Sequence, residues 1–122
     1  MRVTGLGFRR GVSAESLRAA IGLVGLGEAL ATAEDKMREP GLVRLAQDLG
    51  LRILGVPRHA LQAQGVEGSA RVMAAYGTGS VAEAAALAAA GPGARLVQPK
   101  RSGPDGMAVA ALAETWAQGG QA

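Results

Sequence analysis

Residues 2–11 read RVTGLGFRRG, an apolar run that passes directly into a glycine-rich element. We expect residues 2–6 to form a buried first strand, because the run is short, aliphatic and interrupted by glycine. A glycine-rich turn between a strand and the following helix leaves backbone N–H groups free to hold an anion. The element therefore predicts an α/β protein that binds a negatively charged small molecule, and its candidate ligand-binding residues are Gly7, Phe8, Arg9 and Arg10.

Strand and helix patterns alternate along the rest of the chain. We expect further strands at 29–33, 51–56, 95–99 and 107–113, and helices at 14–23, 40–49, 58–64 and 70–76, with a last helix that begins after Ser80 and runs to Ala90. Such alternation is typical of a parallel sheet with helices on both faces, and the final two strands, joined by a short turn, should pair antiparallel. The fold class is thus three-layer α/β/α with about five strands, in one domain that spans residues 1–122.

Five further expectations concern single positions and the tail. We expect Ser13 and Ser69 to cap the helices that follow them. Pro99 should lie near an edge of the sheet or where its strand leaves it. Trp116 should anchor the C-terminus by packing, and residues 118–122 should be frayed.

A second glycine-rich element, Gly77-Thr78-Gly79-Ser80, stands before the alanine-rich helix. Ser80 and Glu83 have the Ser-x-x-Glu spacing of a capping box. One interpretation is that this element only caps the helix. The other is that Gly77, Thr78, Gly79 and Ser80 also present hydroxyl and N–H groups to a ligand.

Composition narrows the class of protein. The chain has 122 residues, no cysteine, one Trp, one Tyr, one Phe and a net charge of +3. The absence of cysteine excludes disulfides and thiolate chemistry and fits a reducing compartment. Few aromatic residues and a small charge argue against nucleic-acid binding. No signal peptide or membrane-length apolar run is visible, so we expect a cytoplasmic protein without a membrane partner.

Charged residues follow several of the predicted strands. Lys36 and Lys100 are placed where a compact cation meets an anionic ligand. Glu34, Asp35 and His59 are weak catalytic candidates: neighbouring carboxylates do acid–base work when burial separates their pKa values, but exposed ones at strand ends usually do not. The single histidine has no partners at metal-binding spacing, so we expect no metal and no cofactor.

A nucleotide-binding module is a weaker alternative. The first element is spaced Gly-x-Gly-x-x-x-Gly, whereas the dinucleotide fingerprint is Gly-x-Gly-x-x-Gly. No acidic residue lies at the expected end of the second strand to hold a ribose, and no phosphate-binding loop with a Gly-Lys-Ser/Thr ending is present.

Four blocks, taken together, resemble a known family. They are Gly5-Leu6-Gly7-Phe8-Arg9-Arg10-Gly11, Lys36-x-x-Glu39-Pro40-Gly41-Leu42, the run from Gly77 to Leu87, and Pro99-Lys100. In this order they resemble the CbiG/CobE family of cobalamin biosynthesis, which includes the C-terminal domain of cobalt-precorrin-5A hydrolase and free-standing CobE-type proteins. The resemblance covers almost the whole chain.

The resemblance implies an α/β domain that acts on corrin-ring intermediates. The full-length hydrolase opens a ring lactone and carries an additional N-terminal domain, whereas this chain begins at its first strand. We therefore expect an accessory or carrier that binds an anionic precorrin, and hydrolysis of a precorrin lactone is the alternative. Other enzymes of the pathway are further candidate partners. On either interpretation Arg9, Lys36, Ser80 and Lys100 should line one cleft.

Overall fold

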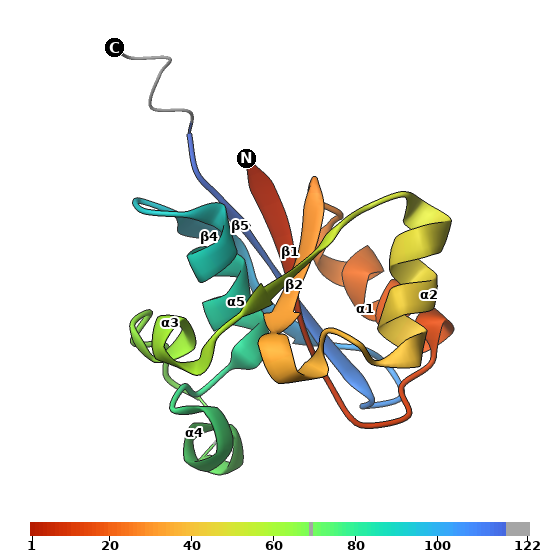
Figure 1. Cartoon of the computed structure of the whole chain (residues 1–122), viewed down its shortest axis with the longest axis horizontal. Coiled ribbons are helices and arrows are strands. Elements are labelled where there is room, and N and C mark those ends of the chain that lie inside the picture. The colour runs from red at the N-terminus through yellow and green to blue at the C-terminus, as the bar shows by residue number, and fades with distance from the viewer. Residues whose placement is uncertain (69, 117–122) are drawn as a thin grey trace.

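The computed structural model describes residues 1–68 and 70–116, in which a five-stranded sheet is flanked by helices (Figure 1). The strands are β1 (Arg2–Phe8), β2 (Ala29–Ala33), β3 (Ile53–Val56), β4 (Arg95–Ser102) and β5 (Ala108–Glu114). The helices are α1 (Ala14–Val24), α2 (Pro40–Leu49), α3 (Arg58–Gln62), α4 (Ala70–Tyr76) and α5 (Val81–Ala90), and a 3-10 turn, η1 (Glu34–Lys36), follows β2. The predicted alternation is confirmed. A predicted helix cap at Ser69 and a predicted frayed end at 118–122 lie outside the described residues.

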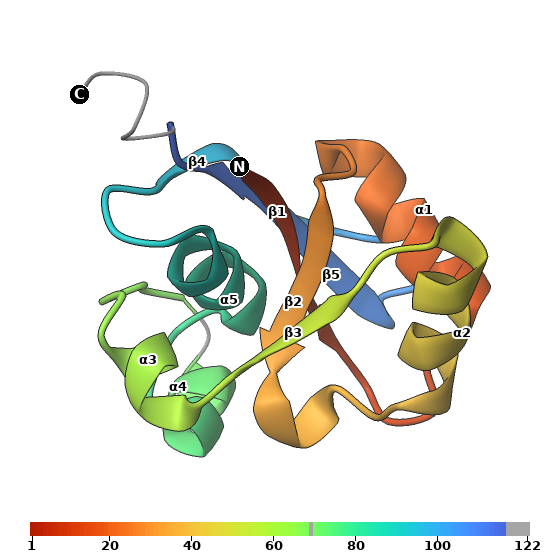
Figure 2. The same cartoon turned by 45° about the horizontal axis from the view of Figure 1, so that its top comes forward.

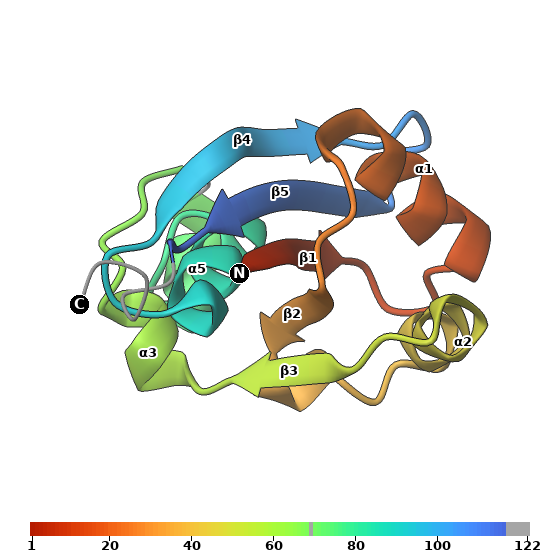
Figure 3. The ribbon, with the colours of Figure 1, turned by 90° about the horizontal axis from the view of Figure 1, so that it is seen from above.

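The strands lie in the order β3-β2-β1-β5-β4 (Figure 3). β1, β2 and β3 are parallel to one another, and β5 is antiparallel to β4, as predicted. β5 also pairs antiparallel with β1, which the sequence did not predict. Arg2 of β1 and Arg95 of β4 both lie opposite Glu114 of β5, so β1 and β4 run in the same direction at the same level. β1, β2, β3 and β4 therefore all end at one side of the sheet, which we call the carboxyl edge.

Helices cover both faces of the sheet (Figure 2). α1 and α2 pack on one face around a core that includes Leu6, Leu17, Leu30, Leu42 and Leu45. α3 and α5 pack on the other face around a core of smaller side chains, mostly alanines of α5 together with Val3, Val56 and Leu61. This arrangement confirms the three-layer α/β/α class. None of the described helices is long and apolar enough to cross a bilayer.

The first glycine element is not a turn before a helix. Gly5 and Gly7 lie inside β1, which extends to Phe8, so the expectation that they leave N–H groups free at a helix start is wrong. The reason is a contact between elements: a Cβ on Gly5 would lie 2.0 Å from the carbonyl oxygen of Ala82 in α5. The glycines let α5 cross β1 in backbone contact. The turn after β1 is closed by the hydrogen bond from the Val12 amide to Arg9 O (3.1 Å), and Ser13 caps α1 as predicted.

Two further predictions concern the C-terminal part of the chain: the position of Pro99 and the packing of Trp116. Pro99 indeed lies in an edge strand, and β4 is irregular on both sides of Gln98, but the strand continues to Ser102 instead of ending at Pro99. We also expected Trp116 to anchor the C-terminus by packing. That expectation is wrong, because its side chain is 71% exposed. Thr115 holds this end through its amide to Met1 O (2.8 Å) and its hydroxyl to Ala90 O (2.6 Å).

Candidate functional site

Lys36 joins the ends of β1 and β2. It is the last residue of η1, the turn that directly follows β2. Its Nζ donates a hydrogen bond to the carbonyl oxygen of Phe8 (3.1 Å) and lies 5.1 Å from the centroid of the Phe8 ring. The half-buried ammonium group is thus fixed at the carboxyl edge, where a cation–π contact adds to the hydrogen bond.

The second glycine element lies against the first. A Cβ on Gly7 would stand 3.7 Å from both the amide nitrogen of Ala82 and the Cβ of Val81, so the start of α5 lies over the end of β1. Ser80 caps α5 by accepting the N–H of Glu83 at 3.2 Å. The helix start that the sequence predicts is therefore confirmed, and it lies at the carboxyl edge, where its N-terminal dipole favours an anion.

The capping box is only half formed. The Glu83 carboxylate does not return to the amide of Ser80; it accepts the backbone N–H of Lys100 in β4 at 2.9 Å. The Lys100 Nζ lies beside Gly68. A Cβ built on Gly68 would be 2.9 Å from this Nζ and 2.4 Å from the carbonyl oxygen of Gly79. Lys100 therefore joins the end of β4 to the loop before α5.

The loop 77–80 owes its shape to its glycines. Gly77 has a φ of +74°, and a Cβ there would overlap the side chain of Gln62. A Cβ on Gly79 would lie 2.1 Å from the amide nitrogen of Gly68. Between them, Thr78 is buried, and its hydroxyl has no hydrogen-bond partner among the residues that the structure describes.

Arg9 and Arg10 are exposed in the turn after β1, where the Arg9 amide donates to Met107 O (3.0 Å). Sequence reasoning missed a further cation, Arg58, which follows β3 and donates to the carbonyl oxygen of Ala75 in α4. Each of the four strands that end at the carboxyl edge thus has a cation at or just after its end. Among the described residues, none of these cations, Lys36, Lys100 and Arg101 included, forms an ion pair.

Two of the catalytic candidates line a hollow. It has a volume of about 170 Å³ and lies between α3, α4 and the ends of β2 and β3; its lining residues are Ala33, Glu34, Asp35, Val56, Arg58, Leu61, Ala75 and Tyr76. The Tyr76 hydroxyl donates to Asp35 at 3.4 Å, and burial, followed by the negative charge of Asp35, raises the pKa of Tyr76. His59 is exposed at the start of α3 and does not line this hollow.

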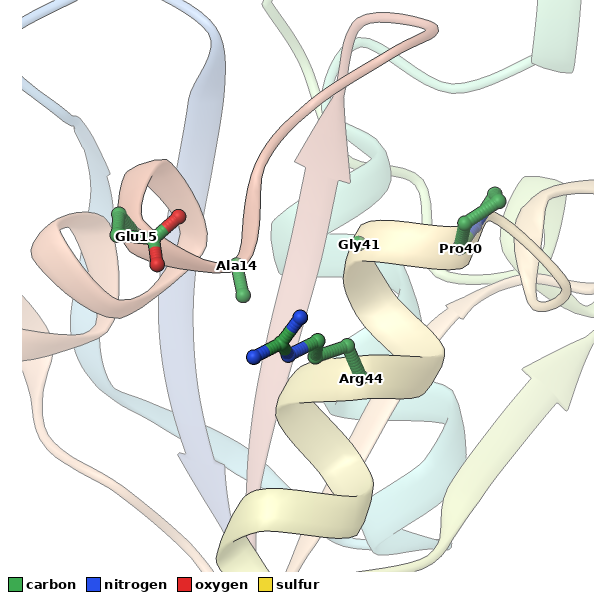
Figure 4. Close-up of a pocket in the computed structure, with 5 residues that line it drawn as sticks. All are labelled: Ala14, Glu15, Pro40, Gly41 and Arg44. Atoms are coloured by element: carbon green, nitrogen blue, oxygen red, sulfur yellow. The ribbon is translucent and has the colours of Figure 1, made fainter.

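A second hollow, of about 270 Å³, lies between the starts of α1 and α2 (Figure 4). The Arg44 side chain extends from α2 toward Ala14 in this hollow. Neither hollow is lined by Arg9, Lys36, Ser80 or Lys100. The chain segments that carry these four residues meet at the carboxyl edge, but the shared cleft that we expected from them stays a prediction. The described residues include no cluster of three or more acidic or histidine side chains that would hold a metal ion.

The segments that converge here are the ones that carry the resemblance noted in the sequence. The sequence model of the family described as "Cobalamin synthesis G C-terminus" matches residues 2–113, from β1 almost to the end of β5. The chain belongs to this family. The match covers every described helix and all of the described sheet except Glu114, the last residue of β5.

Two solved structures are similar to this CbiG-family chain. One is the crystal structure of CobE, a protein from the cobalamin (vitamin B12) biosynthetic pathway; it is 36% identical, the alignment covers 96% of this chain and 95% of that one, and the TM-score is 0.83. The other is the cobalamin biosynthesis protein chiG from Agrobacterium tumefaciens, which is 38% identical over 96% of this chain and 100% of that one, with a TM-score of 0.72. No curated protein matches the chain.

Proposed function

We propose that this member of the CbiG family binds an anionic corrin-ring precursor at the carboxyl edge of its sheet and acts as an accessory or carrier in cobalamin biosynthesis. The observation that carries the proposal is the convergence of three groups at the carboxyl edge: Lys36 bonds to the end of β1, the start of α5 lies over that end, and Lys100 lies beside the loop before α5. These groups come from segments far apart in the sequence, yet all are of a kind that attracts carboxylates.

The chemistry of the ligand fits this edge. Corrin precursors carry acetate and propionate side chains around an apolar ring. Lysine ammonium groups and free helix N–H groups hold such carboxylates, and an arginine fork binds them with two parallel hydrogen bonds. Because the cations at the carboxyl edge form no ion pairs among the described residues, a ligand need not displace a protein carboxylate from them.

The position of the site in the topology also supports the proposal. From β1 the chain moves through α1 and α2 to β2 and β3 on one side, and then returns through α3, α4 and α5 to β4 on the other. In open α/β sheets, ligands bind outside the carboxyl ends of the strands where the direction of winding reverses. Here that point is the end of β1, next to Phe8.

Titration with uroporphyrin, a planar tetrapyrrole with eight carboxylates, tests this proposal. We expect a saturable change in the porphyrin absorbance with the wild-type protein. Lys36→Met and Lys100→Met should each weaken binding by about tenfold, because a hydrogen bond to a charged group contributes roughly 1.5–3 kcal/mol. Arg18→Met is the matched control, since Arg18 lies on α1 and its nearest charged partner is Asp48 at 3.8 Å.

The proposal fails if the wild-type protein shows no binding up to high micromolar porphyrin. It also fails if Arg18→Met weakens binding as much as the lysine variants, because the effect would then follow from net charge and not from this edge.

A further inference from the structure

We propose that the loop before α5 holds a buried subsite for one carboxylate of the ligand, in which the Thr78 hydroxyl is the hydrogen-bond donor. The inference rests on the proposed function for the identity of the ligand. Its physical basis is independent of that function: it starts from a buried hydroxyl group that has no partner among the described residues.

Thr78 is exceptional among the buried threonines. Its side chain is 1% exposed, and its Oγ1 has no hydrogen-bond partner among the described residues. Thr32 is equally buried, but its hydroxyl donates to the carbonyl oxygen of Leu6 at 2.7 Å. Thr4, also buried, bonds to the backbone of the α1–β2 loop at both its donor and its acceptor side. Buried polar groups are nearly always paired, so an orphan hydroxyl needs an explanation.

The backbone amides on either side of Thr78 are already used. The amide of Gly77 donates to Met73 O and the amide of Gly79 donates to Val66 O, both at 2.8 Å. The Thr78 hydroxyl is the buried side-chain polar group of this loop that has no partner among the described residues. It belongs to the segment that leads into α5, a helix of ten residues.

The start of α5 supplies further donors. Ser80 occupies only the amide of Glu83, and the amides of Val81 and Ala82 have no partner within the helix, because the first N–H groups of a helix never do. A carboxylate at this point accepts hydrogen bonds from the hydroxyl and from the helix start, and the helix dipole favours its charge.

Lys100 provides a full positive charge beside this point. Its Nζ lies next to Gly68 and near the Gly79 carbonyl, and it forms no ion pair among the described residues. The backbone of Glu67 and Gly68 packs directly on Gly79, where a Cβ would lie 2.1 Å from the Gly68 amide nitrogen. For a ligand carboxylate to reach Thr78, this contact must open.

Thr78→Val tests the subsite because it removes the hydroxyl and keeps the shape of the side chain. Without ligand, we expect the Tm of Thr78→Val to equal or exceed that of the wild type, since the variant no longer buries an unsatisfied group. Thr32→Val, the matched control, should lower the Tm because it breaks the 2.7 Å bond to Leu6. A Thr78→Val variant with a clearly lower Tm would mean that the hydroxyl serves the fold, which overturns the proposal.

Binding of uroporphyrin gives the second measurement. The affinity should fall about tenfold in Thr78→Val and be retained in Thr78→Ser and Thr32→Val, because only the first variant removes the proposed donor. Equal affinity of Thr78→Val and the wild type would overturn the subsite while leaving the proposed function intact.

Acetate, a simple carboxylate, tests the subsite independently of the proposed function. If the wild type does not bind uroporphyrin, the proposed function fails, and the subsite is then tested with sodium acetate against sodium chloride at equal ionic strength. Acetate should raise the Tm of the wild type more than that of Thr78→Val, since a ligand that binds only the native state stabilises it. Equal shifts would overturn the subsite.

Discussion

At the scale of single residues, the glycines of β1 decide how the two layers meet. Gly5 lies so close to α5 that a Cβ would be 2.0 Å from Ala82 O and 2.8 Å from the Ala86 Cβ. In the sequence these two glycines are separated only by Leu6 and suggest a turn. Nothing in the local sequence shows that a helix more than seventy residues later packs where their side chains would be. The contact brings the start of α5 to the end of β1, so the glycines shape the candidate site through the packing of these two elements.

Gly5→Ala should therefore be strongly destabilising. We expect a loss of at least about 2 kcal/mol in the free energy of unfolding, because the added methyl group meets backbone atoms that can move only with the whole helix. Urea denaturation measures this loss. Gly22→Ala is the control: Gly22 lies exposed within α1 with no atom near its absent Cβ, so alanine there should stabilise by roughly 0.5–1 kcal/mol. A mild effect of Gly5→Ala would contradict the close packing.

At the scale of elements, the sequence predicted best where the cause is local. The Ser80-x-x-Glu83 spacing and the alanine run gave the bounds of α5, and Ser13 gave the start of α1. The sequence predicted less well where the cause is distant: β4 continues past Pro99 because β5 pairs with it up to Ser102. For the site, the sequence predicted the lysines at the strand ends, but it did not single out Arg58, although Arg58 follows a strand in the same way. No sequence pattern shows that the Thr78 hydroxyl has no partner within the part of the chain that the structure describes.

The start of α5 also links two elements, which gives a prediction at this scale. Ser80→Ala removes the helix cap and should lower the free energy of unfolding by about 1 kcal/mol. Because Glu83, in the same first turn, holds the Lys100 amide of β4, hydrogen exchange of that amide should also become faster. Ser13→Ala removes the cap of α1 at a similar cost and should leave the Lys100 amide unchanged. Unchanged exchange at Lys100 in Ser80→Ala would contradict this link.

At the scale of the whole molecule, the two ends of the sheet differ in whether their cations are paired with a carboxylate. At the end opposite the carboxyl edge, Glu114 of β5 lies between Arg2 of β1 and Arg95 of β4 and accepts hydrogen bonds from them at 3.1 and 2.7 Å. This carboxylate thus pairs cations from the strands on both sides of β5. The carboxyl edge has no such pairing among the described residues, which leaves its cations available to a ligand.

The Glu114 cluster makes the stability of the whole fold depend on pH. Burial works to raise the pKa of Glu114, but the hydrogen bonds from Arg95 and Arg2 outweigh it, so the pKa lies below its ordinary value of about 4.5. The unfolded chain consequently takes up the proton at a higher pH than the folded protein. The stabilisation by Glu114 is complete above pH 4.5 and is lost as the pH falls through the lower, folded pKa.

Thermal unfolding of Glu114→Gln at a series of pH values tests this reasoning. At pH 7 the variant should have a lower Tm than the wild type, because glutamine cannot pair with both arginines as an anion. The difference should shrink as the pH falls below about 4.5 and through the lower pKa of the folded protein, since the wild-type carboxylate then becomes protonated. Asp48→Asn, at an exposed pair 3.8 Å from Arg18, should alter the Tm little at any pH. Parallel Tm curves for Glu114→Gln and the wild type would show that Glu114 has the same pKa in the folded and unfolded chain, and the three-strand charge cluster would then contribute nothing that depends on pH.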